Sequence, residues 1–390
     1  MSRFRVAFIP NQNAGVNYYR MATWAFEMRK YRNVEAALYG FQYHSLDVSP
    51  WEYELQFDEE IRRRVDGLCE IADAVVWHPL HYAHSVEFFN QMKVKHGKPF
   101  FIETDDNFLD VPPWNEAFGA YGPGAFHRKM AVESMVNADG LILSTPQLLK
   151  TYTTDPFPFN SNAKVVENSL DFKGDAGFFG WDKVSVRKHR GVKIGWIGGR
   201  THFNDLMMIA PALRILLEKY RNSVSLVLVN SALKLSCEAQ SLRYPFEGLP
   251  NVTEIERSVD INRYAPFAAS FGFDIGIAPL VDCNFNRSKS NLRWLEYSAM
   301  KIPCVASDLN HFRETIKHGE DGFVVEDNEL DVWLSTLEKL VLDENLRSRV
   351  GQAAYKRVKN DFNVKRNAPQ YLRYLKSVVA DGIPVLAEAI

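Results

Sequence analysis

The chain has 390 residues, of which 46% are hydrophobic, and its formal net charge is -2. This length exceeds what one ordinary hydrophobic core needs, so we expect two domains. The near balance of charge gives no general argument for binding to nucleic acid or to a membrane surface. The four cysteines show no metal-type or redox-type spacing, which favours reduced thiols in a cytoplasmic setting.

The N-terminal region enters a strand-like run at 4–9 without a signal-peptide pattern, and the sequence has no apolar run long enough to span a bilayer. We therefore expect a soluble, cytoplasmic protein. A basic cluster at 29–32 keeps peripheral membrane contact open as an alternative.

The first segments of the chain have the pattern of an α/β unit. A buried strand is expected at 5–10, a glycine-containing turn at 11–17 and a helix at 18–31. Such a turn places backbone N–H groups at the carboxyl edge of a sheet. Gly15 is therefore a candidate for ligand contact, and an ordinary tight turn is the alternative.

Polar side chains follow two later strands. His78 comes directly after the strand expected at 73–77, and a group of carboxylates that includes Asp105 follows the strand expected at 98–102. Side chains at such strand ends reach the ligand crevice of an open α/β sheet, where histidine and carboxylates act as acids or bases. The alternatives are a histidine bonded to a backbone group and carboxylates that cap the next turn.

An irregular stretch with several glycines and a basic end separates two α/β patterns. We predict an N-terminal domain at 1–175, a linker at 176–190, a C-terminal domain at 191–362 and a C-terminal helix at 363–390. Two α/β units of similar size predict a ligand cleft between two doubly wound domains.

A glycine turn opens the second α/β pattern. The strand expected at 192–197 leads into the sequence GGRTH at 198–202, and a long helix follows at 204–220. This turn matches neither the Gly-x-Gly-x-x-Gly fingerprint nor the P-loop, so it carries no dinucleotide or nucleoside-triphosphatase signature. Arg200 and His202 beside a helix start can nevertheless hold a diphosphate.

The stretch 271–308 reads as strand, loop, helix and strand, and it carries the strongest functional signal. Its loop at 284–290 is polar and basic and leads into a helix start, where free N–H groups favour an anion. Glu296 lies on the apolar stripe of the helix at 291–300. Because a buried carboxylate is costly without a partner, this stretch predicts a site for a phosphorylated, hydroxyl-rich ligand.

These residues resemble the retaining glycosyltransferases of family 4, which have the GT-B fold. The similarity is strongest at 195–202, 289–290, 295–297 and 303–307, and the sequence GVNYYRM at 15–21 is similar to openings of phage-borne members. The resemblance implies an α/β fold with two doubly wound Rossmann-like domains facing a cleft. It also implies C-terminal helices that pack back toward the N-terminal domain.

The resemblance further implies a nucleotide-sugar donor, with UDP- or GDP-sugars favoured, and no obligatory metal. Glu296 matches the glutamate that holds the ribose hydroxyls, whereas Ser288 stands where the family has a sugar-contacting glutamate. Arg200 and Lys289 would neutralise the departing diphosphate, with His202 as a third cation. The other donor-binding candidates are Gly199, Ser290, Asn291 and Leu292.

In the N-terminal domain, the resemblance places the Gly15 turn near the donor or acceptor and His78 near the sugar. Arg20 would contact the phosphate side or the acceptor, and Asp105 is a candidate acceptor-side base. The family retains the anomeric configuration by same-face attack assisted by the leaving phosphate, so no dedicated nucleophile is implied. The catalytic candidates are His78, Asp105, Arg200 and Lys289.

Three functions remain open at this point. The first is sugar transfer to a hydroxyl of a glycan, a lipid-linked or a small-molecule acceptor. The second is the same chemistry on a modified DNA base, with duplex DNA as partner and basic clusters at 29–32, 62–64 and 187–193 as phosphate contacts. The third is a non-catalytic nucleotide-sugar-binding protein, which the serine at position 288 suggests.

Overall fold

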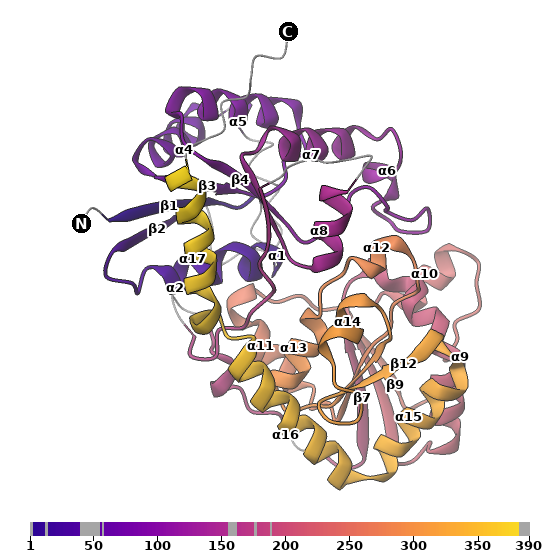
Figure 1. Cartoon of the computed structure of the whole chain (residues 1–390). Coiled ribbons are helices and arrows are strands. Elements are labelled where there is room, and N and C mark those ends of the chain that lie inside the picture. The colour runs from indigo at the N-terminus through magenta and orange to yellow at the C-terminus, as the bar shows by residue number, and fades with distance from the viewer. Residues whose placement is uncertain are drawn as a thin grey trace. The chain divides into compact units, whose positions relative to one another are not determined.

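The chain forms two compact units, which we describe separately (Figure 1). Unit 1 comprises Met1–Val111, Gly119–Ser169 and Val364–Ile390, and unit 2 comprises Pro112–Phe118 and Leu170–Asn363. The computed structural model describes residues 3–11, 15–39, 55–56, 58–154, 162–174, 178–187 and 189–381. Parts of the predicted first glycine turn, of the linker and of the basic cluster before the second domain lie outside the described residues.

Unit 1 contains a six-stranded, wholly parallel sheet with the strand order β2-β1-β3-β4-β5-β6. Its strands are β1 (Phe4–Ile9), β2 (Val34–Leu38), β3 (Ala74–Trp77), β4 (Phe100–Thr104), β5 (Gly140–Leu143) and β6 (Ala163–Val165). The central strands β3, β4 and β5 are buried on both faces, which explains why they read as continuous apolar runs in the sequence.

Helices cover both faces of this sheet. They are α1 (Gly15–Asn17), the π-helical turn η1 (Tyr18–Ala22), α2 (Thr23–Met28), α4 (Glu59–Ile71), α5 (Ala83–His96), α6 (Phe118–Tyr121), α7 (Phe126–Asn137), α8 (Pro146–Thr153) and α17 (Val364–Asp381). As predicted, the C-terminal helix α17 returns to the first sheet, beside α2 (Figure 1). The Tyr371 ring of α17 makes edge contacts with Trp24 at 5.6 Å and with Phe8 at 6.2 Å between centroids.

Unit 2 repeats the architecture with a second six-stranded parallel sheet, in the order β12-β11-β10-β7-β8-β9. Its strands are β7 (Val192–Ile197), β8 (Val224–Val229), β9 (Val252–Ile255), β10 (Ile275–Ala278), β11 (Cys304–Ser307) and β12 (Phe323–Val325). The predicted fold class, α/β with two Rossmann-like domains, is confirmed.

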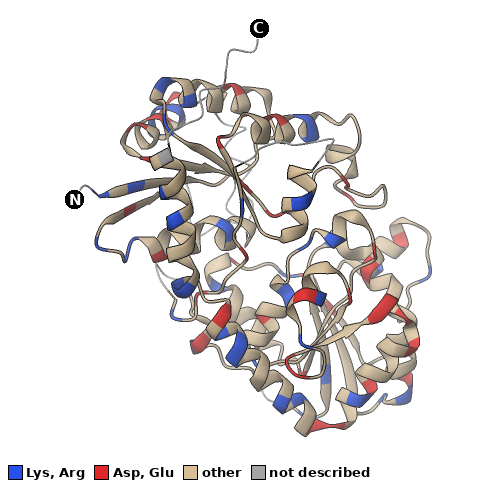
Figure 2. Cartoon of the chain, viewed as in Figure 1, with Lys and Arg blue, Asp and Glu red and all other residues tan. Residues whose placement is uncertain are grey.

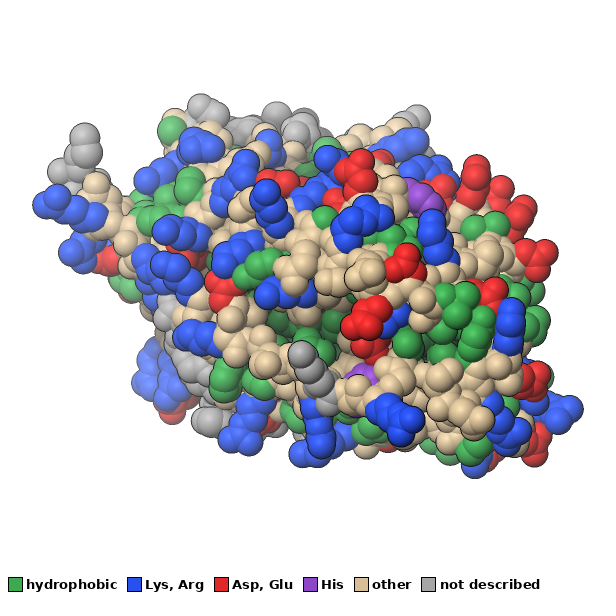
Figure 3. Space-filling model, turned by 90° about the horizontal axis from the view of Figure 1, so that it is seen from below, with side chains coloured by type: hydrophobic (Ala, Val, Ile, Leu, Met, Phe, Trp, Pro, Cys, Tyr) green, Lys and Arg blue, Asp and Glu red, His purple; other side chains and the backbone are tan. Residues whose placement is uncertain are grey.

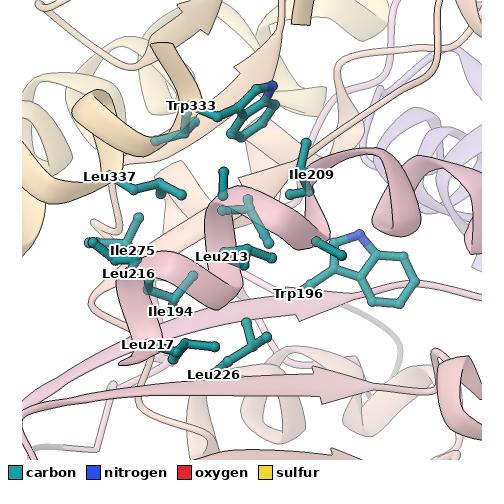
Figure 4. Packing of buried hydrophobic residues seen from close by; sticks show 14 of the residues in the cluster. Ile194, Trp196, Ile209, Leu213, Leu216, Leu217, Leu226, Ile275, Trp333 and Leu337 are labelled. Carbon is teal, nitrogen blue, oxygen red and sulfur yellow. The ribbon is translucent and has the colours of Figure 1, made fainter. Parts of the chain in front are cut away.

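The helical elements of unit 2 connect these strands and follow them. They are η2 (Trp181–Lys183), η3 (Arg200–His202), α9 (Phe203–Lys219), α10 (Leu233–Ala239), η4 (Ile261–Arg263), α11 (Tyr264–Ser270), α12 (Asn284–Arg287), α13 (Leu292–Ala299), α14 (Asn310–Thr315), η5 (Glu326–Asn328), α15 (Leu330–Leu342) and α16 (Glu344–Asp361). Figure 4 shows the core on one face of the sheet, where Leu213 and Leu216 of α9 lie near Trp333 and Leu337 of α15. The helical spacing of these leucines, visible in the sequence, produces this apolar face.

On the other face, two glycines allow aromatic rings to approach the sheet closely, and one of these rings belongs to α13. Gly195 of β7 and Gly276 of β10 are paired across the ladder. A Cβ atom on Gly195 would lie 2.1 Å from the Phe273 ring, and one on Gly276 would lie 2.4 Å from the Tyr297 ring. The Tyr297 hydroxyl donates to the carbonyl of Gly195 at 3.2 Å. The buried Tyr297 ring, packed on Gly276 and hydrogen-bonded to Gly195, thus holds α13 against the sheet.

We expect Gly195→Ala to lower the free energy of unfolding by about 1–3 kcal/mol, because the added methyl group overpacks the Phe273 ring. Gly67→Ala is the matched control, since a Cβ there meets nothing within 4 Å and alanine favours the interior of α4 by up to about 1 kcal/mol. Denaturant unfolding of both variants checks this. Equal midpoints for the two variants would contradict the close contact between Gly195 and the Phe273 ring.

Candidate functional site

The glycine turn after β7 leaves open space at the carboxyl edge of the second sheet. Gly198 must be a glycine, because a Cβ atom there would lie 2.1 Å from the Trp196 ring. Around Gly199, by contrast, an added Cβ would meet no atom of the described residues within 4 Å. The turn therefore leaves room beside the backbone at Gly199.

Asp205, in the first turn of α9, ties this turn to the loop after β10. Its carboxylate accepts a hydrogen bond from the backbone N–H of Val281 at 2.7 Å and one from the Asn286 amide at 3.0 Å. The other oxygen lies 2.7 Å from Nδ1 of His202. Because Asp205 is buried, these bonds fix His202 and the β10 loop relative to each other.

Arg200 is exposed, with 55% of its side chain accessible to solvent. Its Nε lies 3.4 Å from a carboxylate oxygen of Glu116, which is itself 52% exposed. Exposed ion pairs of this kind contribute at most about 1 kcal/mol. The guanidinium can consequently exchange Glu116 for a phosphate at little cost.

The loop between α12 and α13 holds most of the remaining donor-site candidates. Ser288 is buried, and its hydroxyl donates to the Asn284 carbonyl at 3.0 Å. The Lys289 ammonium lies 4.3 Å from the centre of the Phe285 ring. Ser290, Asn291 and Leu292 form the start of α13, with Ser290 and Leu292 partly exposed.

Asn291 occupies the position before the first residue of α13 and is fully buried. Its amide nitrogen donates to the Thr315 hydroxyl at 3.3 Å. Its carbonyl oxygen has no hydrogen-bond partner among the described residues, and its side chain does not cap the helix. The first N–H groups of α13 are thus not satisfied by this side chain.

Glu296 belongs to a three-residue polar group on the buried side of α13. One of its carboxylate oxygens accepts from Arg293 at 2.7 Å and from the Tyr264 hydroxyl at 3.1 Å. Arg293 also donates to the Tyr264 oxygen at 3.2 Å. Burial and the neighbouring Glu296 raise the pKa of Tyr264 above its usual value, so this hydroxyl stays protonated and donates. The expected pairing of the buried carboxylate is thus confirmed.

The predicted residues of unit 1 also share one sheet edge. Gly15 begins α1 after β1, His78 directly follows β3, and Asp105 directly follows β4. Because β1, β3 and β4 are neighbours and parallel, their carboxyl ends lie side by side. Burial lowers the pKa of His78 to about 3, so its imidazole is neutral at pH 7. It can exchange hydrogen bonds there, but it cannot neutralise a phosphate.

A buried ion pair lies beside His78. Arg20 of η1 donates to Glu103 at 2.5 Å, to the Val166 carbonyl at 2.8 Å and to the Asn168 side chain at 2.9 Å. Both charged side chains are at most 1% exposed. The predicted contact of Arg20 with a phosphate or acceptor has no support from this geometry, because its guanidinium is buried among protein partners.

Three side chains at the second sheet were not predicted as site residues. Arg293 stands three residues before Glu296, and this i,i+3 spacing is a signal for an ion pair on a helix. Asp205 follows the glycine turn closely, and its bond to His202 fits the same spacing. Tyr264 comes from α11, 32 positions away from Glu296, and no local pattern indicates its contact.

One segment of the second unit matches a known protein family. Residues 292–357, which begin with α13 and include Glu296, match the family model described as "Glycosyl transferases group 1". The capsular polysaccharide biosynthesis glycosyltransferase CapM of Staphylococcus aureus is 33% identical over 69 residues. This match spans 18% of the present chain and 18% of CapM, so it concerns one segment of each protein.

Solved structures resemble the chain over nearly its whole length. HepE of Anabaena, in complex with UDP and glucose, has a TM-score of 0.64 and 13% identity, and the match covers 96% of this chain and 100% of HepE. Sucrose-phosphate synthase of Thermosynechococcus elongatus has a TM-score of 0.65 and 13% identity, and covers 97% and 100%. The fold is thus that of the GT-B glycosyltransferases. Within this fold, the segment that contains Glu296 is similar to the group 1 glycosyl transferases.

Among the described residues, no helix is both long and apolar enough to cross a membrane.

We expect Asp205→Ala to lower the free energy of unfolding by roughly 2–4 kcal/mol, because it leaves the Val281 N–H and the Asn286 amide without their acceptor. Asp282→Ala, in the same loop, removes a half-exposed partner of Arg287 and should cost less than about 1 kcal/mol. Urea unfolding monitored by tryptophan fluorescence measures both. If the two variants unfold at the same urea concentration, Asp205 does not hold the loop.

Proposed function

We propose that the protein is a glycosyltransferase that uses a nucleotide-sugar donor, bound at the carboxyl edge of the second sheet. The observation that carries the proposal is the pair Glu296 and Arg293 on α13, joined by Tyr264 of α11; the two α13 residues lie within the segment that matches the group 1 glycosyltransferases. HepE, which has a similar fold, is known in complexes with UDP and with UDP-glucose. A UDP-sugar is therefore the first donor to test.

In this proposal the Glu296 carboxylate accepts the ribose hydroxyls, which fits a carboxylate already oriented by two donors. The open space at Gly199 and the start of α13 receive the diphosphate and the sugar. Arg200 and Lys289 supply positive charge to the diphosphate, and His202 is oriented toward the same turn by Asp205.

The chemistry follows from charge. As the bond between the anomeric carbon and the diphosphate oxygen breaks, negative charge accumulates on the diphosphate, and fixed cations and helix N–H groups stabilise it. In the retaining course that we propose, an acceptor hydroxyl attacks the same face of the sugar. The hydroxyl proton passes to the departing phosphate oxygen, so the step needs no protein nucleophile.

For the acceptor side, we propose the carboxyl edge of the first sheet. The neutral His78 would exchange a hydrogen bond with the sugar, and Asp105 would orient the acceptor hydroxyl by accepting a hydrogen bond from it before the proton passes to the leaving phosphate. The buried Arg20 and Glu103 pair would hold this edge in shape, since the side chain of Glu103 comes within 3.9 Å of the His78 ring. The acceptor is a hydroxyl compound whose identity these residues do not specify.

Ser288 distinguishes this chain from the pattern that the sequence resembles. Its buried hydroxyl is hydrogen-bonded to the Asn284 carbonyl, and its short side chain does not extend as far as the carboxylate of a glutamate would. We propose that sugar selection depends instead on other groups at the α13 start. A non-catalytic nucleotide-sugar-binding protein is the outcome that the experiment below separates from an enzyme.

The test is a thermal-shift panel of UDP-, GDP-, ADP- and TDP-sugars, followed by donor hydrolysis with the stabilising donor. We expect one nucleotide to stabilise the wild type, and Glu296→Gln to weaken its binding about tenfold or more, because hydrogen bonds to a charged acceptor contribute roughly 1.5–3 kcal/mol. Glu218→Gln, which changes a half-exposed carboxylate on α9, is the control and should match the wild type.

Binding without hydrolysis of any donor would favour the non-catalytic protein, and no binding at all would overturn the proposal.

The DNA alternative is tested by measuring binding to duplex DNA at several salt concentrations, because such binding weakens steeply as salt rises. Figure 3 shows both basic and acidic side chains on one face, and the net charge of -2 does not favour a strongly basic, phosphate-tracking surface. We therefore expect weak DNA binding.

A further inference from the structure

A cavity of about 440 Å³ opens in unit 1 at the edge of the sheet opposite to Gly15, His78 and Asp105. Its lining comes from the first residues of β1 and β2, from the turn between α2 and β2, and from the end of α4. The cavity lies at the amino ends of the strands and shares no residue with the proposed donor or acceptor sites. Its size is within the range of small-molecule sites, about 300–1,000 Å³.

The polar lining of this cavity is strongly biased toward positive charge. Its charged members are Arg3, Arg5, Arg29, Lys30, Arg32 and Glu35. Figure 2 shows basic segments at the start of β1 and in the turn that leads into β2. The whole chain has a net charge of -2, so this local excess is not a property of the composition.

Carboxylates compensate only part of this charge. Glu35 accepts from Arg3 at 2.7 Å and from Arg5 at 3.1 Å, so one carboxylate serves two arginines. Glu27 pairs with Lys30 at 2.8 Å. Asp73, which is outside the lining, accepts only from the backbone N–H of Arg5. Arg29 and Arg32 therefore have no carboxylate partner among these groups, and Arg3 and Arg5 share a single one.

Arg29 and Arg32 carry this excess. Arg29 uses Nε to bind the Ala36 carbonyl at 2.7 Å, which orders the side chain while that bond uses only one of its five N–H donors. Arg32 is exposed and has no hydrogen bond or ion pair with any residue that the structure describes. Arg29, which is ordered, and Arg32, which has no partner among the described residues, both have planar guanidinium groups. Their N–H groups can donate hydrogen bonds to phosphate oxygens.

The C-terminal end of α2 explains only part of the excess of basic residues in the cavity lining. Basic residues after a helix C-terminus are favourable because they offset the helix dipole, typically by 0.3–1 kcal/mol each. This explains cations that follow α2, but Arg3 and Arg5 come from a strand. The rest of the lining is apolar, with buried Val6, Val34 and Ala36 and with Ile71 at 55% exposure. A ligand with both an anionic and an apolar part fits these surroundings.

We propose that this cavity binds a phosphate monoester that has a short apolar stem, through Arg29 and Arg32. A phosphate monoester carries about -1.5 to -2 charges at pH 7, which matches the two uncompensated arginines. Such a group occurs on soluble phosphorylated metabolites and on phosphatidic acid in a membrane. The site recognises the chemistry that both share, and its position separates it from glycosyl transfer.

The experiment uses the full chain and two probes, glycerol 3-phosphate measured by calorimetry and phosphatidylcholine vesicles containing phosphatidic acid measured by co-sedimentation. We expect the wild type to bind at least one probe, and Arg32→Glu to weaken that binding about tenfold or more through the loss and reversal of a charged contact. Binding to both probes indicates a general phosphate site, and binding to vesicles alone indicates a membrane surface.

Arg63→Glu is the matched control, because it reverses another exposed arginine of unit 1 that does not line the cavity. It should change the affinity less than about twofold, consistent with the weak effect of exposed, distant charges. Donor hydrolysis of Arg32→Glu should equal that of the wild type, which separates this site from the proposed function. Absence of binding to both probes, or equal weakening by the two variants, would overturn the proposal.

Discussion

The contact of the Tyr297 ring with Gly276 determines where α13 can lie. The position of α13 in turn determines the position of the candidate donor site. Gly276 carries no side chain at the point where this ring meets the sheet, and its ladder partner Gly195 makes the same room for the Phe273 ring. The tyrosine hydroxyl then bonds to a strand carbonyl, so the helix is fixed both by packing and by a directional bond. Since Glu296 precedes Tyr297 directly, any shift of this ring would move the carboxylate as well.

Each unit concentrates a charged group at the carboxyl edge of its sheet, but the two groups differ in exposure. Arg20 and Glu103 are completely buried, and extra bonds from Arg20 to Val166 and Asn168 compensate for the loss of hydration. Arg293, beside Glu296, keeps 26% of its side chain exposed. In the second pair Arg293 is therefore accessible to solvent while Glu296 is only 5% exposed, whereas the first pair is an internal support.

Helices and strands are predicted well from the sequence where the spacing of hydrophobic residues and the positions of glycines indicate them. The strand, glycine turn and helix at 192–220 are found nearly as expected, and so is the helix that presents Glu296. Partners that come from distant segments could not be predicted, because Tyr264 meets Glu296 only through the packing of α11 against α13. Arg20 shows the same limit, since its helix position gives no sign that a carboxylate from β4 lies beneath it.

The return of α17 to the first sheet has a consequence for the order in which the protein forms during translation. The face of that sheet with Phe8 and Trp24 is covered by Tyr371 and its neighbours, which follow all of unit 2 in the chain. Because domains fold as they emerge from the ribosome, unit 2 is complete before unit 1 has its last helix. A product that stops before residue 364 would leave this apolar face exposed, and chaperones and proteases would distinguish it from the finished chain.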